Sequence, residues 1–79
     1  MKVLGIKKVS YDRKKDGQHI EGIEIHYSYP SKNIDGVGVE TAFVGQTVVE
    51  QEGGIIPVPG DEIELSYNRW GRVSGYTIQ

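Results

Sequence analysis

The strongest structural signal in this chain is its last segment, residues 59–79, with the sequence PGDEIELSYNRWGRVSGYTIQ. Apolar and polar residues alternate at its start, so Ile63, Leu65 and Tyr67 share one face of a strand. The alternation ends at Asn68–Gly71, where asparagine and glycine suit the positive-φ positions of a tight turn. Apolar residues resume after this turn. The segment therefore predicts a β-hairpin.

The predicted turn carries Trp70, the single tryptophan of the protein, between Arg69 and Arg72. A large apolar ring at a loop tip is costly to expose without a purpose, and two interpretations are open. The ring could stack on a nucleobase while the neighbouring arginines neutralise phosphates. Alternatively, it could fold back over one end of the domain as a plug.

Length and composition predict one small domain, residues 1–79. The chain is 37% apolar and 25% charged, which is typical of a globular protein, and its eleven glycines favour strands joined by turns. It contains no cysteine, which excludes disulfides and thiolate metal sites. No apolar run has the length of a membrane span or a signal sequence, so we expect a cytoplasmic protein without a membrane partner.

The net charge of −2 is distributed unevenly along the chain. Residues 1–20 carry six cations against Asp12 and Asp16, and residues 65–79 carry Arg69 and Arg72 with no acid. Residues 21–64 carry nine acids against Lys32. The two ends of the chain could therefore form one basic surface, or the charges could be a solubilising mixture without a shared face.

Three further strands are predicted before the closing hairpin, at Met1–Tyr11, His19–Tyr29 and Val37–Val44. The segment Gly45–Gly60 is predicted to be a long extended connector. Gln46–Gln51 could form a single helical turn, but three β-branched residues within it weaken that prediction. Five strands with a long connector after the third predict an all-β fold, a small five-stranded OB-like barrel, with an SH3-like barrel as the alternative.

Catalysis is not expected from these residue types. The chain has no cysteine nucleophile, and its glycines lack the strand–loop–helix context of a phosphate-binding loop. His19 and His26 are seven residues apart, about 23 Å along a strand, which is too far to share a metal. We therefore expect a protein that is not an enzyme and has no metal or other cofactor.

The aromatic residues separate into two predicted groups. Tyr27, Phe43, Tyr67 and Tyr76 share strand faces with aliphatic residues, so packing in the core is the first interpretation for them. The three rings at strand ends or in the turn are the most accessible, and these are Tyr11, Tyr29 and Trp70.

Two stretches carry a family resemblance: the first strand from Lys2 to Lys7 with the basic loop ending at Gly17, and the segment Pro59–Val73. They resemble the small phage and mobile-element proteins of Gram-positive bacteria that are similar to the gene-V-type single-stranded DNA-binding proteins. The resemblance implies an OB-like barrel, a homodimer, and cooperative coating of single strands without base preference in the host cytoplasm. It also implies that Arg13–Lys15 is the DNA-binding loop and that Tyr11, Tyr27 and Tyr29 are candidates for ring stacking.

We hypothesise that the chain is a non-catalytic protein that binds single-stranded nucleic acid. DNA is the first candidate ligand and RNA the second. The expected phosphate contacts are Lys7, Lys8, Arg13, Lys14, Lys15, Arg69 and Arg72, and the expected stacking residues are Tyr11, Tyr29 and Trp70. Glu21, Glu24 and Glu40 would repel phosphate if they shared the binding face. The alternative is a protein-binding module, such as a phage inhibitor or a DNA mimic built on the acidic middle of the chain.

Overall fold

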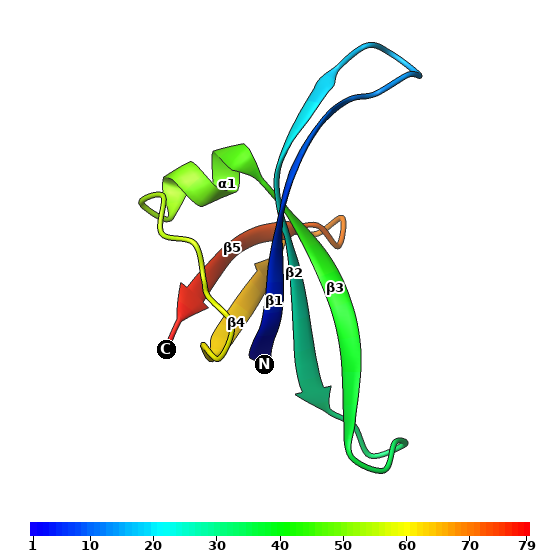
Figure 1. Ribbon diagram of the computed structural model, residues 1–79, viewed down its shortest axis with the longest axis vertical. Coiled ribbons are helices and arrows are strands. Elements are labelled where there is room, and N and C mark those ends of the chain that lie inside the picture. Colours follow the sequence, from blue (N-terminus) through cyan, green and yellow to red (C-terminus); the bar gives the residue numbers. More distant parts are fainter.

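A computed structural model describes residues 1–79 as five strands and one short helix (Figure 1). The all-β prediction is confirmed. The elements are β1 (Lys2–Asp12), β2 (His19–Pro30), β3 (Val37–Gly45), α1 (Gln46–Gln51), β4 (Ile63–Tyr67) and β5 (Val73–Ile78).

The first sheet has the order β1-β2-β3, with both pairs antiparallel. Its strands are long, and the β1–β2 hairpin extends beyond the body of the molecule (Figure 1). We call this projecting part, residues 10–21, the arm. The register shifts between Val3 and Gly5, which is typical of a β-bulge.

The second sheet is the predicted closing hairpin, β4 paired with β5. Asn68 closes its turn twice: its backbone N–H donates to the carbonyl of Arg72 (2.8 Å), and its Oδ1 accepts from the N–H groups of Trp70 (2.9 Å) and Arg72 (3.0 Å). Gly71 has φ of 78°, a conformation that glycine adopts without strain. The predicted turn is present and Gly71 has the predicted positive φ, but Asn68 does not, and it stabilises the turn through its side chain instead.

The two sheets join where β1 and β4 begin. The N–H of Val3 donates to the carbonyl of Asp61 (2.8 Å), and the N–H of Ile63 donates to the carbonyl of Met1 (2.8 Å). An isolated bridge pairs Lys2 with Glu62 between these bonds. We call this junction the seam. On the opposite side, β3 and β5 approach each other without pairing, so the sheets do not close into a continuous ring.

The core lies between the sheets and α1. Its eight buried residues are Val3, Ile23, Ile25, Tyr27, Val44, Val49, Ile63 and Tyr76. Burial of Tyr27 and Tyr76 confirms two of the four aromatic predictions. The other two are wrong, because Phe43 is 46% exposed and Tyr67 is 52% exposed. Pairing sets Phe43 opposite Glu24, on the face of the sheet away from the core, whereas the neighbouring Val44 lies opposite Ile23 and is buried.

The helix α1 forms in the segment whose β-branched residues argued against it. Val49 packs into the core, and this tertiary contact outweighs the weak local preference. Gly53 and Gly54 follow with positive φ, and the N–H of Gly54 donates to the carbonyl of Val49 (2.9 Å) to end the helix. This helix has six residues, and the chain forms no helix long and apolar enough to cross a membrane.

Candidate functional site

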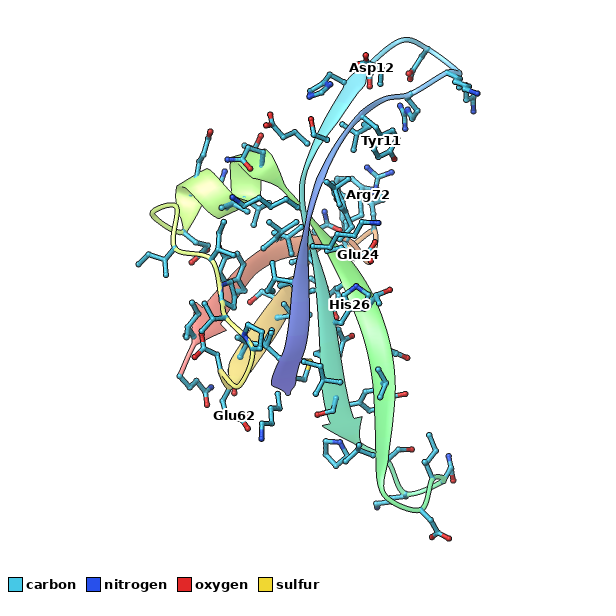
Figure 2. All side chains as sticks on the ribbon, viewed as in Figure 1. Tyr11, Asp12, Glu24, His26, Glu62 and Arg72 are labelled. Carbon is cyan, nitrogen blue, oxygen red and sulfur yellow. The ribbon has the colours of Figure 1, made fainter.

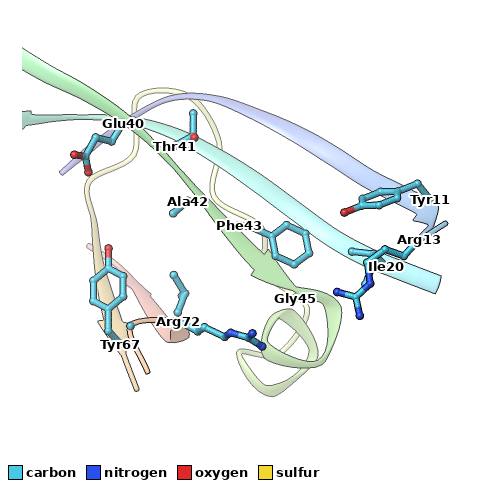
Figure 3. Close-up of a pocket in the computed structure, with 12 residues that line it drawn as sticks. Tyr11, Arg13, Ile20, Glu40, Thr41, Ala42, Phe43, Gly45, Tyr67 and Arg72 are labelled. Carbon is cyan, nitrogen blue, oxygen red and sulfur yellow. The ribbon is translucent and has the colours of Figure 1, made fainter. Parts of the chain in front are cut away.

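A cleft of about 670 Å³ lies between the arm, the edge of β3 and the turn of the closing hairpin (Figure 3). Three segments far apart in the sequence line it. They contribute Tyr11, Arg13 and Ile20 from the arm, five residues from Glu40 to Gly45 in β3, and Tyr67, Gly71, Arg72 and Val73 from the closing hairpin. Figure 3 shows Tyr11 and Arg13 at one end of the cleft and Glu40 and Tyr67 at the other.

The arm presents an aromatic ring and a guanidinium to the cleft. Tyr11 and Ile20 are directly opposed in the β1–β2 register, so they share one face of the arm. Arg13 is bound by a neighbour: its Nη2 lies 2.6 Å from Oδ2 of Asp16 and 3.2 Å from Oε1 of Gln18. The bonds from Arg13 lower the pKa of the Asp16 carboxyl, which stays ionised and compensates the charge of Arg13.

Phe43 forms the floor of the cleft on β3. Its ring packs over Gly22, where a Cβ would lie 3.0 Å from Phe43 Cζ and would overlap the carbonyl oxygen of Val44. Glycine at position 22 therefore allows this close approach of ring and strand. Phe43 was not predicted as a site residue, because it shares a strand face with aliphatic residues and that pattern indicates the core.

The closing hairpin supplies the second cation. Arg72 lines the cleft, and no carboxylate lies within ion-pair distance of it. Figure 3 shows the Arg72 side chain extending toward the end of the cleft where Tyr11 and Arg13 lie, and Figure 2 shows both Tyr11 and Arg72 on the same part of the molecule, near the base of the arm. Trp70 is 70% exposed, which contradicts the plug interpretation, and the guanidinium of Arg69 lies 4.4 Å from its ring centroid. Trp70 lines an adjoining hollow together with Asn68 and Arg72.

The opposite end of the cleft is acidic. Glu40 accepts hydrogen bonds from the hydroxyls of Tyr27 (3.2 Å) and Tyr29 (3.4 Å). Burial, followed by the adjacent hydroxyl of Tyr67 and the Glu40 carboxylate, raises the pKa of Tyr27, so this hydroxyl remains a donor. The ring of Tyr29 covers Gly38, where a Cβ would overlap it. Tyr29 thus lies beside an acid, away from the basic loops with which the sequence analysis grouped it.

The remaining predicted cations do not line the cleft. Lys14 and Lys15 occupy the tip of the arm. Lys7 lies opposite Glu24, whose carboxylate is 2.8 Å from His26 Nε2. Lys8 points to the other face of β1 and lines a separate hollow.

The far face of the arm carries a second polar arrangement. His19 Nδ1 lies 2.9 Å from Oδ1 of Asp12, and His19 Nε2 lies 3.2 Å from Oγ of Ser10. These atoms have the order of a serine-hydrolase triad, but the Asp12 side chain is 80% exposed, whereas such a triad has a buried acid and an oxyanion hole. The geometry supports a structural role, in which these side-chain contacts stabilise the arm. No three His, Cys, Asp or Glu side chains are grouped to hold a metal.

No protein-family model, curated protein or solved structure matches this chain. The interpretation of the cleft therefore depends on its own geometry. Of the predicted site residues, Tyr11, Arg13 and Arg72 line it together, with Phe43 added by the structure.

Proposed function

We propose that this chain is a non-catalytic protein that binds single-stranded nucleic acid in the cleft. DNA is the first candidate ligand and RNA the second. The observation that carries the proposal is the meeting of two cations, Arg13 and Arg72, with two exposed rings, Tyr11 and Phe43. Cations neutralise phosphates, and exposed rings provide surfaces on which bases stack without regard to sequence. A cleft that combines both along a strand edge has the chemistry of a single-strand groove.

The arrangement of the strands supports the same proposal. A partly open OB-like barrel is supported by four features: the sheet β1-β2-β3, the pair β4–β5, the seam between β1 and β4, and a helix between β3 and β4. OB-folds bind oligonucleotides on the face of strands 2 and 3, between the first and last hairpin loops. The cleft lies between those two loops. We extend the proposal to the homodimer and the phage or mobile-element origin that the family resemblance implies.

Titration with oligo(dT) tests the proposal directly. Binding should quench the fluorescence of Trp70, because this ring lies beside Arg72 at the rim of the cleft. The logarithm of the affinity should fall by about 0.7 per phosphate contact for each tenfold rise in salt. If a labelled 12-mer shows neither quenching nor increased anisotropy at low salt, the cleft does not bind nucleic acid.

Replacing Asp16 with asparagine should tighten this binding. The change removes the anion that holds Arg13, while the amide oxygen can still accept from the N–H of Gln18 (3.1 Å). We expect affinity for oligo(dT) at 50 mM salt to rise by about two- to fivefold, measured by anisotropy.

Asp35→Asn is the matched control for Asp16→Asn. It removes the same charge from the β2–β3 loop, outside the cleft, and should leave the affinity at its wild-type value. Weaker binding by Asp16→Asn would mean that the Arg13–Asp16 pair is needed to shape the arm.

A further inference from the structure

Glu40 is the single acid among the residues that line the cleft. It lies at the end opposite Arg13, beside the exposed ring of Tyr67 (Figure 3). An anion here repels phosphate, so it opposes the function that Arg13 and Arg72 support unless a different part of the ligand reaches it.

The Glu40 carboxylate is held in place by neutral donors. The hydroxyls of Tyr27 and Tyr29 donate to its two oxygens, one to each, and no cation lies within ion-pair distance. An ionised carboxylate has about four acceptor positions, so two remain for a ligand. The side chain is exposed on the cleft side, where a ligand can use them.

A nucleobase is the part of the ligand that can donate to this carboxylate. The Watson–Crick edge of thymine presents one N–H between two carbonyl oxygens, which a carboxylate repels. Cytosine and adenine present one amino group beside an acceptor nitrogen. Guanine presents N1–H and the N2 amino group side by side, and this donor pair suits the two oxygens of a carboxylate.

We infer that the Glu40 end of the cleft binds a guanine base by its Watson–Crick edge, with Tyr67 beside it. This inference rests on the proposed function. It differs from binding without base preference at one position, where the cleft prefers guanine. Glu40 lies three residues along β3 from Phe43, about 10 Å at the usual rise of a strand, and this odd spacing directs the two side chains to opposite faces of the strand. A base at Glu40 and a base stacked on Phe43 therefore belong to different nucleotides.

The test uses four labelled 12-mers of oligo(dT), with thymine, guanine, hypoxanthine or adenine at one central position. Anisotropy with the wild-type protein should show the guanine oligonucleotide binding about five- to tenfold more tightly than oligo(dT). Hypoxanthine keeps the N1–H but lacks the amino group, so it should lose most of this gain. Adenine, which keeps only the stacking surface of a purine, should bind no better than hypoxanthine.

Two variants test whether Glu40 causes the guanine preference. Glu40→Gln should bind oligo(dT) more tightly, because an anion is lost, and should bind the four oligonucleotides with similar affinity. Glu64→Gln removes the same charge from an exposed position of β4 outside the cleft and should keep the wild-type preference.

The outcomes separate this inference from the proposed function. Equal wild-type affinity for all four oligonucleotides overturns the guanine inference and leaves the proposed function standing. A guanine preference that persists in Glu40→Gln overturns the role of Glu40. Failure of all four to bind at low salt overturns the proposed function itself. Because the first comparison uses only the wild-type protein, it does not depend on the folding of a variant.

Discussion

Alanine at Phe43 and alanine at Arg72 should each weaken oligo(dT) binding about tenfold, but only the arginine change should alter the salt dependence. Phe43 offers an exposed ring in the cleft, and base stacking contributes about 1–3 kcal/mol, so its loss weakens binding by roughly 5- to 150-fold. Arg72 has no carboxylate partner and can neutralise a phosphate. Its loss should reduce the slope of log affinity against log salt by about 0.7.

Two control variants match these changes outside the cleft. Val39 is exposed on the same face of β3 as Phe43, and Lys32 lies in the loop between β2 and β3. Val39→Ala and Lys32→Ala should keep wild-type affinity and slope in the same anisotropy titrations. If they weaken binding as much as the cleft variants, the ligand covers another surface.

Alanine at Gly22 should cost more stability than any surface change, by about 2–4 kcal/mol of unfolding free energy. The new Cβ would overlap the backbone carbonyl oxygen of Val44, and a carbonyl in a strand cannot move aside as a flexible side chain does. A domain of this size has only a few kcal/mol of stability in total, so a large fraction of the protein should be unfolded at 37 °C. Urea unfolding followed by circular dichroism measures the loss.

Gly5→Ala is the matched control, because Gly5 also lies in a strand of the first sheet. A Cβ there meets nothing within 4 Å, and its φ is not in the left-handed region. Alanine should leave the stability unchanged or raise it by up to about 1 kcal/mol, through the lower entropy of the unfolded chain. Equal losses at both positions would mean that the contact with the Val44 carbonyl does not set the cost.

The strands and the closing hairpin were predictable because their information is local. Alternation from Ile23 to Tyr27 specifies a half-buried strand, and Asn68 with Gly71 specifies the turn. The side of β3 that faces inward was not predictable in the same way, since apolar residues occur on both of its faces. The register of pairing with β2 determines which face of β3 points to the core, and it buries Val44 and exposes Phe43.

The candidate site was predictable only in its parts. Charge along the chain indicated that the first loop and the last turn are basic, but their meeting depends on how the sheets are arranged in space. The ion pair between Arg13 and Asp16 could have been predicted from the sequence, since the two residues are three apart in one loop. Glu40 could not be assigned to the cleft, because its position at the acidic end depends on contacts with Tyr27 and Tyr29 across the sheet.

The open side of the molecule, where β3 and β5 lie close without pairing, has a consequence for hydrogen exchange. A ligand that touches both Phe43 and Arg72 spans this side, while the seam holds the other. Opening the second sheet would then first require release of the ligand. Amide protons of β4 and β5 should therefore exchange more slowly when the cleft is occupied, even where they touch no ligand.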